Sequence, residues 1–187
     1  VSLYSLDLRN IYCYLVTGGY RTGKKNFLKV LMQVALEKDS KIAVIDSSGF
    51  GMKMKNNKHA DRITYVYNDK EIFDYFNELM PEFIRRNNLK NNMLEEGMEE
   101  SEIYERMCQE ERIFICIPNL SWFIKSIYNS SYNLKSCLEN IIEKGSLHNI
   151  YIVANLDIED RIELDRYELF NLFVSYRTGI HFGGNIG

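Results

Sequence analysis

The sequence predicts a three-layer α/β fold built on a mainly parallel β-sheet. Short apolar runs alternate along the chain with longer segments in which apolar residues recur at helical spacing. Each apolar run is continuous rather than alternating, which is typical of strands covered on both faces. The 187 residues suffice for one domain with a full core. We therefore expect residues 1–187 to form a single domain with helices on both faces of the sheet.

The elements are predicted in chain order from these two patterns. Strands are expected at 11–16, 41–46, 63–67, 113–117, 150–154 and 178–182. Helices are expected at 25–37, after residue 68, at 101–111, 119–129 and 133–144, and over most of 158–174. Asn68 is a predicted N-cap with Glu71 as its capping-box partner. Residues 49–60, rich in Gly, Lys and Met, are expected to form a loop.

The segment between the third and fourth strands carries three further expectations. Pro81 should kink or restart the helix that contains it, because proline lacks the backbone N–H. Residues 87–100 are polar and biased in composition, which predicts a mobile loop. Ser101 is expected to cap a short acidic helix that ends near Glu111.

Composition and charge disfavour several classes of protein. The net charge is −3 and the pI about 5.7, whereas nucleic-acid binders carry a basic face, so nucleic acid is not an expected partner. No signal peptide is visible and no apolar run has the roughly 20 residues of a membrane span, so we expect no direct membrane contact. The four cysteines form no C-x-x-C pair, which favours reduced thiols of a cytosolic protein. The three histidines lack metal-ligand spacing.

An acidic stretch lies at residues 94–111, with eight glutamates and a single arginine. Two interpretations stay open. The stretch is either a solvated helix face or a surface for a basic partner.

A glycine-rich loop follows the first predicted strand and precedes a predicted helix. The loop matches G-x-x-x-x-G-K, the phosphate-binding P-loop, in the context that this motif requires. Its glycines allow backbone N–H groups to converge on an anion, and the helix N-terminus adds positive charge. The predicted ligand-binding residues are Gly18, Gly19, Tyr20, Arg21, Thr22, Gly23, Lys24 and Lys25. The alternative is a tight turn that needs Gly18 and Gly23 for steric reasons alone.

Lys25 occupies the position at which this motif has serine or threonine. The hydroxyl of that residue normally binds Mg²⁺, whereas an ammonium group repels a cation. We therefore expect ATP to be a possible but weakly bound cofactor, and we expect no Mg²⁺. Arg21 could contact a phosphate or point to solvent.

The motifs together resemble those of the FtsK/SpoIIIE-type ATPase domains. YLVTGGYRTGKKNFLKVLMQ is similar to their P-loop and first helix, and NELMPEFIRRNN to their helix that ends in an arginine pair. RIFICIPNL stands where that family has its Walker B strand, and GSLHNIYIVANLDIED where it has its sensor strand. GGYRTGKKN and GIHFGGN most resemble the last, degenerate ATPase domain of the Firmicute type VII secretion motors. The resemblance implies a P-loop NTPase (RecA-like) fold.

The departures from that family bear on catalysis. Walker B needs a carboxylate, but Pro118 and Asn119 follow the fourth strand. Leu156, after Asn155, stands at the sensor glutamine position. Asp46 is the nearest substitute carboxylate, but the family's strand order puts it far from the P-loop, so we interpret it as a turn residue. We predict no catalytic residue and no metal ligand.

The resemblance implies a non-hydrolysing ATPase module excised from a longer chain. Its expected partners are neighbouring ATPase domains of that chain, exported type VII substrates and a possible hexameric ring of the parent. The parent would be membrane-anchored, with this domain on the cytoplasmic side. Two alternatives stay open: an active NTPase with unorthodox metal coordination, and a DNA-translocase module.

Trp122 is the predicted partner-binding residue. It lies off the helical stripe of apolar residues that surrounds it, so it could face a neighbouring domain or a bound peptide. The alternative is a half-buried surface tryptophan.

Overall fold

Six parallel strands form one sheet in the order β3-β2-β4-β5-β1-β6. The computed structural model describes residues 7–50 and 58–183. The strands are β1 (Cys13–Gly18), β2 (Lys41–Ile45), β3 (Ile63–Val66), β4 (Ile113–Ile117), β5 (Ile150–Asp157) and β6 (Thr178–Phe182). All six predicted strands are confirmed, two of them at both ends, and the other ends differ by at most three residues. Residues 51–57 of the predicted loop at 49–60 lie outside the described part.

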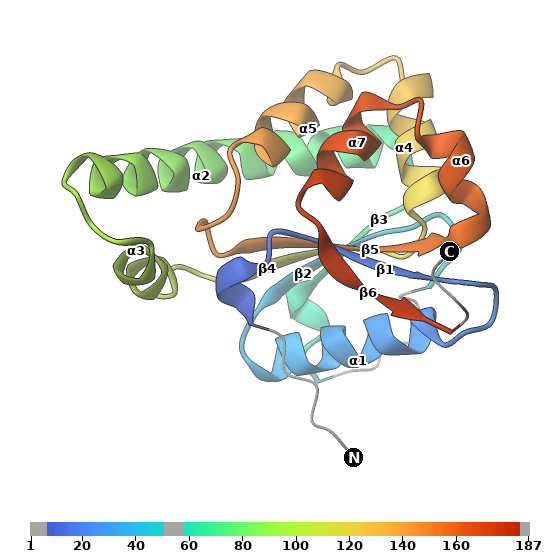
Figure 1. The fold of residues 1–187 in the computed structure, drawn as a ribbon, viewed down its shortest axis with the longest axis horizontal. Coiled ribbons are helices and arrows are strands. Elements are labelled where there is room, and N and C mark those ends of the chain that lie inside the picture. Colours follow the sequence, from blue (N-terminus) through green and yellow to red (C-terminus); the bar gives the residue numbers. More distant parts are fainter. Residues whose placement is uncertain (1–6, 51–57, 184–187) are drawn as a thin grey trace.

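Helices cover both faces of this sheet, which gives the predicted three layers (Figure 1). The α-helices are α1 (Lys24–Glu37), α2 (Asp69–Glu95), α3 (Glu100–Met107), α4 (Leu120–Asn129), α5 (Leu134–Glu143), α6 (Arg161–Leu164) and α7 (Glu168–Ser175). Short 3-10 helices lie at η1 (Leu8–Asn10), η3 (Ala60–Arg62) and η4 (Ile158–Asp160). The predicted helix at 158–174 is therefore three pieces. No helix in the described residues is long and apolar enough to cross a membrane.

The sheet separates two apolar cores. Among the described helices, α1 is the long one on one face, and its Leu28 and Met32 pack against strand residues such as Val153. Helices α2, α4, α5 and α7 cover the other face, where Phe76 and Ile152 belong to the larger cluster. Alternate residues of each strand serve the two cores because successive side chains point to opposite faces.

Helix α2 contradicts the loop predicted at 87–100. The helix runs unbroken from Asp69 through Pro81 to Glu95, so the predicted restart at Pro81 is wrong. Asn68 caps it as predicted, because its side chain accepts from the Glu71 backbone N–H at 3.0 Å.

Charged residues that are buried hold the second half of α2 to the body of the domain. Arg86 is 1% exposed and donates to the carbonyls of Glu111 (2.8 Å) and His148 (2.9 Å). Lys90 donates to the carbonyl of Lys144 at 2.6 Å. This segment therefore has a buried face although most of its residues are polar, and its composition did not indicate that face.

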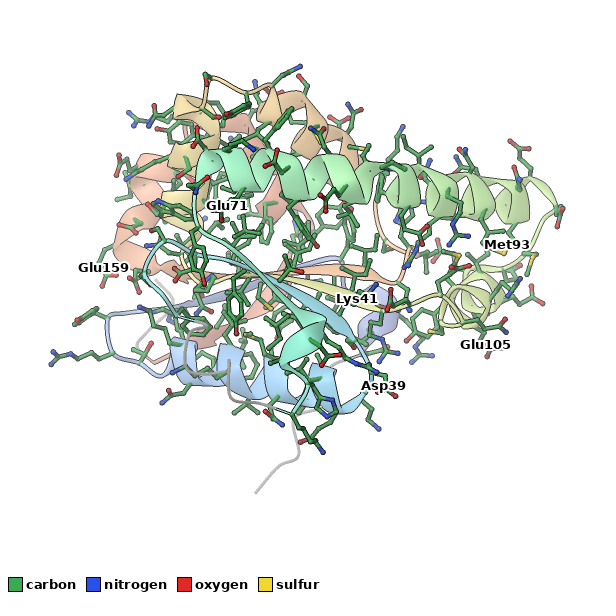
Figure 2. The ribbon with its side chains drawn as sticks, turned by 180° about the vertical axis from the view of Figure 1, so that it is seen from behind. Asp39, Lys41, Glu71, Met93, Glu105 and Glu159 are labelled. Carbon is green, nitrogen blue, oxygen red and sulfur yellow. The ribbon has the colours of Figure 1, made fainter. Side chains whose placement is uncertain are left out.

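The end of α2 and helix α3 form an arm at one side of the domain (Figure 1). Met93, Ile103 and Met107 make a small core of their own, and Figure 2 shows Met93 on the side of α2 that faces α3. The N-cap of α3 is Glu99, in a reciprocal capping box with Glu102, so the predicted cap at Ser101 is two residues late. Most glutamates of this arm are exposed to solvent.

The four cysteines are free thiols. Cys13 and Cys116 are both buried, but Cys13 belongs to the core under α2 and α4, and Cys116 to the core under α1. Burial raises the pKa of the Cys13 thiol strongly, and it raises the pKa of Cys116 to about 12. Cys108 and Cys137 are partly exposed.

Candidate functional site

A cavity of about 330 Å³ lies where the carboxyl ends of β1, β4 and β5 meet the N-terminus of α1. In parallel α/β sheets, ligands bind at this edge of the sheet. The cavity is lined by Tyr20, Arg21, Thr22, Gly23, Lys24, Lys25, Asn26, Pro118, Asn119, Asn155 and Asp157. Six of the eight residues predicted from the P-loop motif are in this set, and Gly18 and Gly19 contact the same site through their carbonyl groups.

The backbone of the loop requires glycine at two of its positions. A Cβ added to Gly18 would lie 2.4 Å from the carbonyl oxygen of Phe182, so no side chain fits there. Gly23 has a φ of +98° and open space around it, which is a conformational rather than a steric requirement. Arg21 also has a positive φ, of 61°. Gly18 is therefore required for steric reasons, as the alternative held. This requirement is compatible with a phosphate-binding loop.

Lys24 is 6% exposed and its ammonium lies inside the loop. Nζ donates to the carbonyl oxygens of Gly18 (2.7 Å) and Gly19 (2.5 Å). It also lies 2.7 Å from Oδ1 of Asp157, at the end of β5. The lysine that would meet a phosphate is therefore surrounded by oxygen atoms of the protein itself.

The other cations of the loop are exposed. Lys25 points its charge toward solvent at the position of the magnesium-binding hydroxyl. The Arg21 guanidinium lies 5.2 Å from the centre of the Tyr20 ring, and Tyr20 is 75% exposed. Arg21 therefore stacks on a neighbouring side chain at the rim of the cavity. Thr22 braces the loop through a 2.9 Å hydrogen bond to the carbonyl of Gly19.

The end of β4 supplies no ionisable group to the cavity. Pro118 and Asn119 follow the strand, as the sequence required. The Asn119 side-chain oxygen accepts from the backbone N–H of Trp122 at 2.9 Å, so this amide is the N-cap of α4. Its residue type is thus explained by helix capping.

Leu156, which the resemblance puts at the sensor glutamine position, does not line the cavity. Leu156 is 2% exposed and packs into the core under α4, on the face away from the loop. Asn155 and Asp157 lie on the opposite face and line the cavity. The Leu156 side chain therefore cannot contact a ligand in the cavity. Strand parity was the missed signal, because Tyr151 and Val153 already place odd-numbered residues of β5 on the α1 side.

Asn155 is a buried polar residue without a partner. It is 3% exposed, and neither atom of its amide group has a hydrogen-bond partner within the part of the chain that the structure describes. Burying an amide without hydrogen bonds costs about 1–3 kcal/mol, so such groups are rare outside functional sites. The amide is thus available to a group bound in the cavity.

Carboxylates elsewhere do not build a metal site. Asp46 accepts hydrogen bonds from the backbone N–H groups of Ser48 and Phe50, at 3.0 and 2.8 Å, which confirms its interpretation as a turn residue. Strands β4 and β5 separate β2 from β1. Among residues 7–50 and 58–183, no group of three or more His, Cys, Asp or Glu side chains is placed to hold a metal ion.

Trp122 lines a second, more open groove of about 440 Å³ with Tyr67, Asp69 and Lys125. The indole is half-buried and packs against the margin of the larger core. Trp122 therefore has both an exposed edge and a structural contact.

No protein-family model matches the sequence, and no curated protein does. Solved structures do match in fold. A structure of the cytoplasmic domain of EssC has a TM-score of 0.70 at 16% identity, over 90% of this chain and 31% of that one. The chain has the EssC fold. A structure of ATPases 2 and 3 of EssC from Geobacillus thermodenitrificans has a TM-score of 0.64 at 16% identity, over 94% of this chain and 32% of that one.

Two further structures extend this likeness beyond EssC. The cytoplasmic domain of the type VII secretion ATPase EccC from Thermomonospora curvata has a TM-score of 0.60 at 15% identity, over 96% of this chain and 20% of that one. TcpA, the pCW3 conjugation coupling protein, was determined with ATPγS and has a TM-score of 0.55 at 17% identity. That match covers 82% of this chain and 44% of TcpA. The chain thus spans less than half the length of each structure.

Proposed function

We propose that this chain is a degenerate ATPase module of a membrane-anchored type VII secretion motor, which binds a phosphate-bearing ligand weakly and does not hydrolyse it. The observation that carries the proposal is the cavity at the P-loop. It keeps a glycine-rich cradle and a buried Lys24, but has Lys25, Pro118 and Asn119 at the magnesium-binding and Walker B positions. The likeness in fold to EssC and EccC supports the assignment to a secretion motor.

The cavity favours anion binding over phosphoryl transfer. Phosphoryl transfer relies on Mg²⁺ to neutralise the developing charge and on a polar group to orient the nucleophile. The exposed Lys25 replaces the hydroxyl that would bind the metal, and the side chain of Asn119 caps a helix. ATP is therefore the proposed ligand, bound weakly and without a contribution from Mg²⁺.

The rim of the cavity favours contact with other proteins. Three large apolar side chains are exposed in the phosphate loop and in the segment that follows β5: Tyr20 at 75%, Ile158 at 38% and Ile162 at 87%. Isolated exposed apolar residues are common, whereas contiguous exposed apolar patches mark interaction sites. We propose that neighbouring ATPase domains of the same chain, or of a hexameric ring on the cytoplasmic side of the membrane, pack there. Exported substrates are the proposed partners of the groove at Trp122.

The decisive experiment is an ATP hydrolysis assay on the purified 187-residue chain with Mg²⁺. We expect no turnover. Turnover on the order of 1 s⁻¹, an ordinary enzymatic rate, would contradict the proposal. The matched control is Lys24→Ala, because any activity of this site must disappear in that variant.

One observation favours the alternative of an active NTPase with unorthodox metal coordination. Asp157 places a carboxylate in the cavity, although from β5 rather than β4. If Asp157 bound a metal, Asp157→Asn would abolish Mg²⁺-dependent turnover. If the chain is inactive, the variant has no activity to lose and the alternative fails.

A further inference from the structure

The ion pair between Lys24 and Asp157 engages the ammonium group that a phosphate would need. An ammonium has three N–H donors. In Lys24 the three nearest oxygen atoms are the carbonyls of Gly18 and Gly19 and Oδ1 of Asp157, at 2.7, 2.5 and 2.7 Å. A more distant fourth contact, Oγ1 of Thr22, lies at 3.5 Å. A phosphate oxygen can reach Nζ only if one of these acceptors leaves.

The exposure of the three nearest acceptors indicates which of them a phosphate would displace from Lys24. The two carbonyls belong to the backbone of the loop, and Gly18 cannot move without disturbing its contact with β6. The side chain of Asp157 is 47% exposed, whereas that of Lys24 is 7% exposed. A half-exposed carboxylate regains water when it turns outward, so its release is the least costly of the three.

Asn155 provides independent support for a ligand at this place. Its buried amide lines the same cavity and has no partner among the described residues. Asn155 lies two residues before Asp157 on the same face of β5, so a ligand that displaces the carboxylate comes within range of both a cation and an amide.

We propose that Asp157 is an internal competitor of anionic ligands at Lys24, an autoinhibitory contact that sets the affinity of the site. The inference rests on the proposed function, because it requires the cavity to accept phosphate. The ligand class is a triphosphate, whose several charged oxygens can outcompete one carboxylate. Either a nucleoside triphosphate or inorganic tripolyphosphate supplies this chemistry.

The test compares Asp157→Asn with a matched charge-removing variant, Glu159→Gln. Glu159 is exposed, lies near the phosphate loop at the same end of the molecule (Figure 2), and forms no ion pair with Lys24. Calorimetric titrations use ATP and sodium tripolyphosphate, both without Mg²⁺. We expect Asp157→Asn to tighten the binding of both ligands about tenfold, which corresponds to about 1.4 kcal/mol. Glu159→Gln should change either affinity less than twofold.

Each failure has its own signature. Equal affinities of the wild type and Asp157→Asn, or equal gains in both variants, overturn the competition but keep the binding site. A gain for ATP without one for tripolyphosphate overturns it as well, because the competition is for the phosphate group. If neither ligand binds to the wild type or to Asp157→Asn, both the competition and the proposed phosphate site fail. Asp157→Ser serves as the second variant if the asparagine variant does not fold.

Discussion

Lys24 and Lys25 are neighbours in sequence but lie in opposite environments. Lys24 is buried among oxygen atoms of the loop, whereas Lys25 is exposed at the mouth of the cavity. The first α-helical turn causes this difference, because consecutive residues point about 100° apart around the helix axis. Substitutions at the two positions should therefore have different consequences.

Replacement of Lys25 tests the proposed absence of a magnesium effect. In the wild type we expect Mg²⁺ to raise the affinity for ATP by less than tenfold, because the ammonium repels the metal ion. Lys25→Thr supplies the missing hydroxyl and should show a larger response to Mg²⁺. Lys25→Ala, which removes the charge without adding a ligand, is the control. A wild-type gain of tenfold or more, about 1.4 kcal/mol, would mean that the role of Lys25 is wrong.

The residues of the site were only partly predictable from the sequence. The P-loop segment was found because its chemistry is local: glycines and lysine at fixed spacing on a strand, turn and helix. Asn155 and Asp157 were missed because they reach the loop through pairing between β1 and β5, strands that are more than 130 residues apart. The ion pair with Lys24 depends on that register and cannot be seen in a motif.

At the scale of the element, Arg86 is the more deeply buried of the two charged residues that hold α2 to the rest of the molecule. Arg86 links the middle of the helix to the segments just before β4 and β5 through the backbone carbonyls of Glu111 and His148. Its neighbour Arg85 instead bonds to Glu82 and Glu110 near the surface. Hydrogen bonds from Arg85 and Arg86 lower the pKa of Glu82 to about 2. Of the two arginines in the motif, Arg86 therefore has a structural role in the interior, and Arg85 forms ion pairs at the surface.

Arg86→Met should destabilise the domain strongly. The variant leaves two buried carbonyl groups without donors, and each unsatisfied group costs about 1–3 kcal/mol. We expect the melting temperature to fall by about 4–24 °C, at about 2–4 °C per kcal/mol in a chain of this size. Arg85→Met is the control and should leave it nearly unchanged. Equal losses in the two variants would contradict the structural role of Arg86.

Helix α4 carries the predicted partner contact. Trp122→Ala should weaken capture of the partner in the parent protein, because an aromatic anchor at an interface contributes about 2 kcal/mol or more to binding. The melting temperature should fall by only a few degrees, since the indole is half-buried. Tyr128→Ala, at another half-buried aromatic residue of α4 outside the groove, should leave capture intact. A large loss of stability with intact capture would mean that Trp122 is a core residue.

At the scale of the whole molecule, His148 links stability to pH. It is fully buried, and burial together with the charges of Lys90 and Arg86 lowers its pKa to about 3. In the unfolded chain its pKa is about 6.5, so between about pH 3 and 6.5 the unfolded chain binds the extra proton. The stabilisation is therefore complete above about pH 6.5 and is lost as the pH falls toward 3.

Unfolding experiments on His148→Phe measure this effect. From pH 7 to 5, neutral His148 should account for a loss of about 2 kcal/mol in the wild type that the variant does not show. The ring would keep its packing against Phe83. Parallel losses of stability in the two proteins would show that His148 is not the titrating group.

The fold as a whole was predictable because its pattern is redundant. Six apolar runs, each joined to the next by a helical or loop segment, specify a parallel sheet without any single residue being decisive. The second half of α2 was not predictable from composition, since its buried side is made of Arg86, Lys90 and Met93. Arg and Lys can bury their aliphatic stems against a protein surface. A search for regularly spaced apolar residues does not count them, so it predicts a loop where such a helix lies.

The reactivity of the two buried cysteines can show in which order the two helical layers detach from the sheet during unfolding. Cys13 on β1 and Cys116 on β4 lie in one sheet with β5 between their strands, and they point to opposite faces. Each therefore becomes reactive toward a thiol reagent only when its own helical layer detaches. Mass spectrometry of peptides after timed alkylation would resolve them individually. Equal rates would mean that the sheet and both layers unfold as one unit. Faster modification of Cys116 would show that the single helix α1, which carries the phosphate loop, separates first.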